Sequence, residues 1–305
     1  MSIETYLKQI ARGARGARDL ERGPAHDLFA QVLERRASDL EIGAFCVAMR
    51  IKGESAQELA GFYDAIKARL ATLCVSRPVI LLPSYNGARK TPLMTPLLAR
   101  LLADKGYAVL VHGLHEEARR TGSEQVFTAM GWPVAQDVRS VETCLEGSGS
   151  AYCSLDVLSP ELAWLLWVRR TLGLRNSGHV LAKLINPVQT RSLQIVNYTH
   201  PEYPDVLAGF FALHPASAVF MRGHEGEPVP GPRRLPEIAG QVEGVAIRTE
   251  AQFFDTPTVE GEADIDVGAT VALYRRVISG AEAAPPELAA WTDLIERIFP
   301  ISPAV

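Results

Sequence analysis

The sequence lacks the residues that usually mark a disulfide scaffold or a cysteine-based metal site. Among its 305 residues only four are cysteines, far apart and without metal-ligand spacing, at Cys46, Cys74, Cys144 and Cys153. Such isolated thiols are typical of free cysteines in a reducing compartment. Long apolar runs are missing as well, and the first residues show no basic segment followed by an apolar one. We therefore expect a cytoplasmic protein without a membrane partner.

An excess of positive charge is also missing. Lysine and arginine together number 31, against 35 aspartates and glutamates, which gives a formal net charge of -4. A domain that binds nucleic acid through its bulk charge is usually basic. Any nucleic-acid contact must therefore come from a local patch. The length suffices for one large or two modest domains with a substantial core.

Two kinds of apolar periodicity divide the chain. Residues 3–72 read as helical, with Asp39 as an N-cap and Ser55 with Glu58 as a capping box. From Arg77 onward, helical segments alternate with short apolar runs that read as strands, at Val79–Leu82, Ala108–Val111, Ala151–Cys153, Leu193–Val196, Ala218–Met221 and Gly244–Arg248. This alternation predicts an α/β protein, with a small N-terminal α-helical bundle domain and a larger α/β domain around a mostly parallel central sheet.

One helical segment interrupts the alternation. Pro160–Leu172 reads as a long helix that rejoins the N-terminal bundle. We therefore place the α-helical domain at 1–72, joined by about 159–186. The α/β domain then comprises 73–158 and 187–305, and ends in two helices at about Asp266–Ser279 and Pro285–Ile298.

Two polar loops follow neighbouring strands of the predicted sheet. The first is Pro83-Ser-Tyr-Asn-Gly-Ala-Arg-Lys90, and the second begins with His112-Gly113. Parallel strands deliver such loops to the same edge of a sheet, where open α/β folds bind ligands. Backbone N–H groups with Ser84 and Lys90 could hold an anion there, although an ordinary strand–helix turn explains the first loop equally well. His112 could act as a base or a phosphate donor, but a structural histidine is the commoner case.

A group of arginines near the N-terminus has spacings of three, three and four residues, at Arg12, Arg15, Arg18 and Arg22. On a helix these side chains would form one basic stripe suited to nucleic-acid phosphates. Gly13, Gly16 and Gly23 weaken that helix, so a solvated face competes with this interpretation. A second basic pair, Arg233-Arg234, follows a charged loop.

Several segments together resemble the anthranilate phosphoribosyltransferase family along nearly the whole chain. Gly43–Gly61 is similar to that family's N-terminal helix-turn-helix, and His112-Gly113 with Thr121-Gly-Ser123 is similar to its second ligand loop. Val168–Arg175 and Leu184–Pro187 are similar to a later helix and Asn-Pro turn. The resemblance implies a small α domain, often the dimer interface, and a larger α/β domain. It also implies a homodimer through the α-helical domain, and of the family's ligand-handling residues only Ser123, Arg169 and Asn186-Pro187 persist. Together with the residues of the two loops, the candidate anion or phosphate ligands are Ser84, Asn86, Gly87, Lys90, His112, Gly113, Ser123 and Arg169.

The sequence departs from that family at its ligand loops. The family's Gly-Thr-Gly-Gly-Asp is replaced by Pro83-Ser-Tyr-Asn-Gly87, and its Lys-His-Gly-Asn-Arg by Val111-His-Gly-Leu-His115. The region of the magnesium-binding Asp-Glu pair reads Gly226-Glu-Pro-Val229. These changes remove the groups that orient and neutralise a pyrophosphate leaving group. Ordinary anthranilate phosphoribosyl transfer is therefore not expected. Neither magnesium nor another cofactor is expected, and no catalytic residue is assigned.

Two further segments, Gly13–Leu20 and Gly223–Pro228, resemble the YbiB-type branch, whose members keep the transferase fold but bind DNA without evident sequence preference. This resemblance implies a nucleic-acid-binding protein on a degenerate transferase scaffold, with contacts at Arg12, Arg15, Arg18, Arg22, Arg233 and Arg234. Two alternatives stay open. One is a glycosyltransferase or phosphoribosyltransferase with a different acceptor, which would use the cleft formed by loops 83–90 and 112–123. The other is a non-enzymatic sensor or protein-interaction module.

Overall fold

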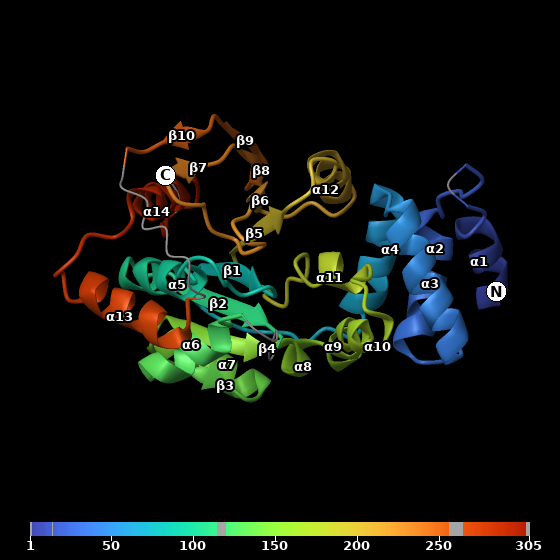
Figure 1. Cartoon of the computed structure of the whole chain (residues 1–305), viewed down its shortest axis with the longest axis horizontal. Helices are drawn as coiled ribbons and strands as arrows, with labels where there is room; N and C mark the ends of the chain where they lie inside the picture. The colour runs from blue at the N-terminus through green and yellow to red at the C-terminus, as the bar shows by residue number, and fades with distance from the viewer. Residues whose placement is uncertain (1, 14, 115–119, 256–264, 303–305) are drawn as a thin grey trace. The chain divides into compact units, whose positions relative to one another are not determined.

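The computed structural model describes residues 2–13, 15–114, 120–255 and 265–302, and the chain divides into two compact units (Figure 1). The helical unit comprises Met1–Ala71, Leu158–Pro187 and Glu202–Pro215. The α/β unit comprises Thr72–Val157, Val188–Pro201 and Ala216–Val305. A helical domain together with a larger α/β domain that has a mostly parallel sheet is the predicted fold class.

The helical unit contains α1 (Ile3–Ile10), α2 (Arg22–Leu33), α3 (Asp39–Lys52), α4 (Ala56–Lys67), α9 (Pro160–Trp167), α10 (Arg169–Leu172), α11 (Gly178–Leu181) and α12 (Tyr203–Leu213). Its core includes the stacked rings of Phe29 and Phe62, with centroids 4.7 Å apart, and Phe45 edge-on to both. The predicted capping box of Ser55 and Glu58 begins α4. None of the described helices combines the length and apolar character needed to cross a membrane.

Four details of the helical unit differ from the prediction. Ser38, not Asp39, caps α3, because its hydroxyl accepts from the N–H of Glu41. The helical pattern of residues 3–72 is interrupted, since α1 ends at Ile10 and α2 begins at Arg22. Between α9 and α10 the predicted long helix breaks at Val168.

The fourth difference concerns α12, which the prediction placed in the α/β domain. This apolar helix packs against α4 of the helical unit, where the rings of Phe210 and Tyr63 meet at 5.3 Å. Leu207, Phe210 and Phe211 are buried. The sequence shows that α12 is apolar, but it does not show which unit covers the apolar face.

The α/β unit contains β1 (Val79–Ser84), α5 (Thr95–Asp104), β2 (Ala108–Gly113), α6 (Ser123–Met130), β3 (Val134–Ala135), α7 (Val138–Gly147), β4 (Ser150–Ser154), β5 (Ser192–Tyr198), β6 (Ala218–Arg222), β7 (Arg234–Leu235), β8 (Ile238–Val242), β9 (Val245–Thr249), β10 (Gln252–Phe253), α13 (Val267–Ile278) and α14 (Pro286–Ile298). A short helix, α8 (Leu155–Leu158), follows β4. The main sheet has the order β3-β4-β2-β1-β5-β6-β8-β9. Its strands pair in parallel from β3 to β6, and β8 and β9 pair antiparallel.

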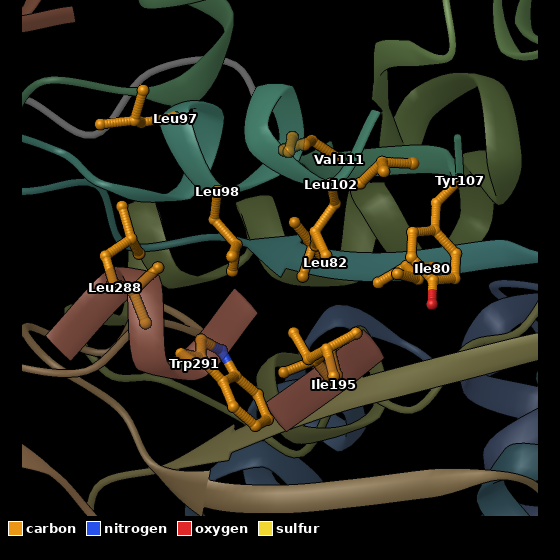
Figure 2. Close-up of a cluster of buried hydrophobic side chains, with 14 of the residues drawn as sticks. Ile80, Leu82, Leu97, Leu98, Leu102, Tyr107, Val111, Ile195, Leu288 and Trp291 are labelled. Carbon is orange, nitrogen blue, oxygen red and sulfur yellow. The ribbon is translucent and has the colours of Figure 1, made fainter. Parts of the chain in front are cut away.

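A buried apolar cluster holds the central strands in place. Figure 2 shows Leu98 and Leu102 extending from α5 toward Leu82 and Ile80 of β1, with Trp291 of α14 in the same cluster. Every residue of β1 is buried, as expected for a central parallel strand. Each fully buried aliphatic side chain contributes about 1.5–3 kcal/mol. The ends of β1 and β2 are therefore fixed supports for the loops that follow them.

Candidate functional site

The two predicted loops meet at the carboxyl ends of β1 and β2. Ser84 and Gly113 are register partners, and a Cβ added to Gly113 would lie 2.1 Å from the carbonyl oxygen of Ser84. Only glycine fits at this point. The Ser84 hydroxyl lies 2.6 Å from that of Ser123, which begins α6. Residues 115–119 of the second loop lie outside the described residues.

The first loop forms a concave row of backbone donors, which we name the oxyanion cradle. It consists of the N–H groups of Asn86, Gly87, Arg89, Lys90 and Thr91. A two-bond bridge between Ala88 and Thr121 fixes its shape, with N···O distances of 3.0 and 2.8 Å. Several N–H groups that converge on one side of a loop make an anion site without requiring a charged side chain.

Two carboxylates from this same chain occupy the cradle. Glu227 accepts from the N–H groups of Asn86 and Gly87 at 3.0 and 2.9 Å. It also accepts from the hydroxyls of Ser84 and Thr95 at 2.5 and 2.7 Å. Glu227 is 1% exposed, so this buried carboxylate has four donors for its two oxygens.

Glu225 fills the other half of the cradle. Its carboxylate accepts from the N–H groups of Arg89, Lys90 and Thr91 at 3.0, 3.0 and 3.2 Å. The Thr91 hydroxyl adds a bond at 3.2 Å, and the Arg120 guanidinium lies 3.4 Å away. Backbone dipoles therefore provide most of the compensation for this charge.

The turn that carries both carboxylates, residues 224–227 between β6 and β7, is held tightly against the cradle. The carbonyl of Gly226 accepts from the side-chain amides of Asn86 and Asn197 at 2.6 and 2.5 Å. Gly226 has φ 86°, and a Cβ there would lie 2.0 Å from the Asn86 amide nitrogen. Glu225 itself has φ 49°, an uncommon conformation for a side-chain-bearing residue. We name this segment the glutamate turn.

The two carboxylates differ in their acid strength. Burial raises the pKa of Glu227 despite its hydrogen bonds to Ser84 and Thr95. Burial would also raise the pKa of Glu225, but the N–H groups of Lys90, Arg89 and Thr91 outweigh it and hold that pKa below the ordinary value of 4.5. Glu225 is therefore the more firmly ionised of the two.

The glutamates of this turn do not fit the role of magnesium ligands. Magnesium needs oxygen ligands in a near-octahedral arrangement, usually one or two carboxylates with water and phosphate. Here Glu225 and Glu227 face hydrogen-bond donors. Within the described ranges, no group of three or more histidine, cysteine, aspartate or glutamate side chains could hold a metal ion.

His112 is placed beside the cradle but is not equipped as a cationic phosphate ligand. Its Nδ1 lies 2.8 Å from the hydroxyl of Tyr85, and its side chain is fully buried. Burial lowers its pKa to about 3, so the imidazole is neutral at physiological pH. Among the described residues, its Nε2 has no hydrogen-bond partner.

The remaining candidate anion ligands are divided between the units. Lys90 belongs to the cradle through its N–H, and its side chain is exposed. Arg169 lies in α10 of the helical unit. From the sequence, the loop with Glu225 and Glu227 could carry metal-binding carboxylates or a nucleic-acid contact, or be only a charged loop; their role as hydrogen-bond acceptors of the first loop was not predicted. A signal was present, because two glutamates flank a glycine in a turn expected near the same sheet edge.

The N-terminal arginines occupy a loop and not a helical stripe. Residues 11–21, which we name the arginine loop, connect α1 to α2 and leave Arg12, Arg15 and Arg18 exposed. Arg22 is the first residue of α2, and its guanidinium binds Asp64 at 2.6 and 3.0 Å. The predicted stripe of four is therefore wrong: glycine-rich backbone ends α1, and Arg22 is engaged in an ion pair.

The arginine loop is anchored at its C-terminal end. The N–H of Leu20 donates to the buried carboxylate of Glu58 at 3.0 Å. Lys52 bridges Glu58 and Asp19, at 2.6 and 2.5 Å. These bonds tie the loop to the capping box that begins α4.

The second basic pair lies in the α/β unit. Arg234 is placed over the ring of Phe253 at 5.3 Å, and Arg233 lies 4.0 Å from Asp255. Both arginines are exposed. The two predicted arginine groups thus belong to different units.

Comparison with known proteins assigns this architecture to a family. A family model described as glycosyl transferase family, helical bundle domain, matches residues 4–69. The Escherichia coli (strain K12) protein YbiB, described as uncharacterized, is 35% identical over 293 residues, which cover 94% of this chain and 91% of YbiB. An anthranilate phosphoribosyltransferase of Anaeromyxobacter dehalogenans (strain 2CP-C) is 30% identical over 273 residues, 88% of this chain and 81% of that enzyme. The chain belongs to the anthranilate phosphoribosyltransferase-like family.

Solved structures of the anthranilate phosphoribosyltransferase-like family share the fold. The enzyme from Thermus thermophilus superposes with a TM-score of 0.77 at 21% identity, over 98% of this chain and 90% of that chain. The Saccharomyces cerevisiae enzyme in complex with PRPP and Mg gives a TM-score of 0.74 at 16% identity, over 97% and 88%. These structures show the shared fold, and the sequence relatives confirm the predicted family.

Proposed function

We propose that this protein binds nucleic acid without sequence preference, on a transferase scaffold that no longer carries out ordinary anthranilate phosphoribosyl transfer. The observation that carries this proposal is the arginine loop. Arg12, Arg15 and Arg18 are exposed, and among the described residues none of them forms an ion pair with a carboxylate. Three unneutralised guanidiniums on a short loop suit the phosphates of a nucleic-acid backbone.

The anchoring of the loop supports the same proposal. An arginine cluster on an unanchored segment loses conformational entropy when it binds. Here the bonds of Leu20 and Asp19 to the Glu58–Lys52 pair fix one end of the loop before any ligand arrives. The guanidiniums of Arg12 and Arg18 donate to backbone carbonyls close to them in the chain, which leaves their positive charges without a carboxylate partner. A loop that carries three exposed guanidiniums and is anchored at its base is better suited to binding a phosphate backbone than to packing.

The experiment that tests this proposal is a salt titration of binding to double-stranded and single-stranded DNA by fluorescence anisotropy. The triple variant Arg12→Gln, Arg15→Gln, Arg18→Gln should weaken binding to all sequences alike. Each phosphate contact contributes about 0.9 to the slope of log K against log salt on double-stranded DNA and about 0.7 on single strands, so the slope should fall in magnitude by about 2.7 and about 2.1 respectively.

A matched control removes three exposed arginines of the α/β unit by Arg139→Gln, Arg275→Gln and Arg297→Gln. It changes the net charge by the same amount and should leave the slope nearly unchanged. If both triple variants lose the same amount of DNA affinity and slope, the change would be explained by net charge alone and not by contacts of the arginine loop. Absence of binding by the wild type at low salt would overturn the proposal.

The alternative is a glycosyltransferase or phosphoribosyltransferase that acts on a different acceptor. Membership in the family favours it. The oxyanion cradle opposes it, because Glu225 and Glu227 occupy the donors that a diphosphate would need. The first proposal accounts for both features, since it requires no empty cradle.

We also propose that the protein is a homodimer joined through the helical unit. Helix α3 carries an exposed apolar row at Leu40, Ala44, Val47 and Ile51, spaced four, three and four residues apart. Leu40 and Ile51 are 87% and 70% exposed. Such a row on one helix face is characteristic of a surface that a second helix covers. A dimer would also present two arginine loops to one nucleic acid.

A further inference from the structure

We propose that Glu225 and Glu227 form an intramolecular plug, whose carboxylates occupy an oxyanion site of this chain and keep it closed to free phosphate. Removal of the Glu225 carboxylate would open the site to an oxyanion of the phosphate class. This inference goes beyond nucleic-acid binding and does not depend on it. It rests on the α/β unit, whereas the arginine loop belongs to the helical unit.

The first support is that the donors are arranged for an anion. Five N–H groups and the hydroxyls of Ser84, Thr91 and Thr95 all donate to the two carboxylates. Within the cradle only Ala88 turns its N–H away, to the carbonyl of Thr121. Buried N–H groups need an acceptor, and a row of them that faces one way is a preformed oxyanion site.

The second support is that the charge of Glu225 is balanced mainly by dipoles. Among the described residues the one cationic side chain paired with it is Arg120, at 3.4 Å. Its three N–H bonds and one hydroxyl bond are shorter, at 3.0 to 3.2 Å. The surroundings of this carboxylate therefore resemble those of a bound oxyanion more than those of a salt bridge.

The third support is the backbone of the glutamate turn. Glu225 has φ 49°, in the left-handed region that glycine or asparagine adopts at lower cost. A residue held in this region is retained where its surroundings demand it. What glutamate provides there, and glycine does not, is a carboxylate that reaches the N–H groups of residues 89–91.

The plug also explains why the site is closed in the native chain. A phosphate that entered the cradle would lie beside two carboxylates, and like charges at such distances repel strongly in a partly buried site. Glu225 must therefore leave first. Its side chain is 12% exposed, whereas Glu227 is 1% exposed, so Glu225 forms the outer half of the plug.

The test compares phosphate binding to the wild type and to Glu225→Gly by isothermal calorimetry, with chloride at equal ionic strength as the reference. Glycine removes the carboxylate and relieves the positive φ. The variant should bind phosphate at least about tenfold more tightly than the wild type, because the plug no longer competes for the same charge-assisted bonds.

The matched control is Glu243→Gly, since Glu243 has φ 51° and forms an ion pair with Arg191 outside the cradle. It should bind phosphate no better than the wild type. To exclude phosphate captured by the arginine loop, the comparison is repeated with Arg12→Gln, Arg15→Gln and Arg18→Gln added. The higher phosphate affinity that Glu225→Gly confers should persist when the three arginine substitutions are also present.

If Glu225→Gly is unstable, Glu225→Asn keeps a residue that tolerates the left-handed region, and hydrogen exchange of residues 89–91 gives a second readout. Those amides should lose protection in either variant and regain it with phosphate. The proposal is overturned if the wild type binds phosphate as tightly as the variants, or if the variants do not distinguish phosphate from chloride. Neither result would bear on DNA binding by the arginine loop.

Discussion

Glu225 and Glu227 occupy neighbouring halves of one cradle, yet their environments shift their acidities in opposite directions. The N–H groups of residues 89–91 lower the pKa of Glu225 against the effect of burial, whereas burial raises the pKa of Glu227. A carboxyl with a lowered pKa stabilises the folded state when it is ionised, and one with a raised pKa opposes its own ionisation. Glu225 therefore contributes most to the stability of the folded state at neutral pH, whereas Glu227 contributes most at acidic pH.

The first residue-scale prediction concerns Glu225→Gln. At neutral pH this variant should be less stable by about 1.5–3 kcal/mol, the value of hydrogen bonds to a charged group. Because the folded pKa is lowered, the wild-type advantage exists above 4.5 and is lost as the pH falls through the folded pKa. Urea unfolding at neutral pH and below 4.5 measures it. An advantage that stays constant across this range would contradict the assignment.

The second residue-scale prediction concerns Glu227→Gln, for which stability should depend on pH in the opposite direction. Because the folded pKa of Glu227 is raised, the stability of the wild type relative to this variant should be greatest at low pH. It should decline as the pH rises from 4.5 through the raised pKa. The glutamine oxygen can still accept from the N–H groups of Asn86 and Gly87, so the variant should fold.

At the scale of elements, helix α3 has two apolar faces. Ile42, Phe45, Cys46 and Met49 are buried in the helical unit, whereas Leu40, Val47 and Ile51 face outward. A surface helix of a monomer needs only the first face. The second face is the element-scale basis for the proposed dimer.

Light scattering after size exclusion tests that dimer. Leu40→Glu with Ile51→Glu should convert a dimer to a monomer, because charges would be buried against apolar surface without partners. The control is Val245→Glu, which changes an apolar residue that is 64% exposed on β9 of the α/β unit. It should leave the mass unchanged. A monomeric wild type would refute the proposed dimer.

The strands and the loops differ in how far the sequence predicts them. All six predicted strands are present. Five of them are largely buried in the parallel part of the sheet, as their apolar runs indicate, whereas the sixth, β9, is a largely exposed antiparallel strand. The short strand β8 was missed because Gly240 and Gln241 interrupt its apolar pattern. Residues 3–72 were predicted as helical although glycines weaken the segment around the arginines, because the sequence does not show whether such glycines only weaken a helix or end it; here α1 ends at Ile10.

At the scale of the whole molecule, the family scaffold is retained and its ligand site is altered. We expect calorimetry with phosphoribosyl diphosphate and magnesium to give no measurable binding to the wild type. The reason is that the donors of residues 86–91 are already engaged, and the glutamates of the turn do not present a metal site. Binding that Lys90→Ala and His112→Ala abolish would instead favour the transferase alternative. Arg233→Ala is a suitable control, because its exposed side chain lies near Asp255.

The sequence by itself determined the fold class, the family and the departure of the ligand loops from the transferase pattern. The fold class follows from local periodicity, whereas the family and the departure follow from the resemblance of short motifs in their order along the chain; neither needs long-range information. Only the tertiary structure revealed that Glu225 and Glu227 fill the cradle, because the partners lie more than 130 residues apart in the chain. Tertiary contacts also assigned α12 to the helical unit and Arg22 to an ion pair with Asp64. A charged loop reads the same in sequence whether it faces water or neutralises a row of N–H groups, and the difference lies in what the fold places against it.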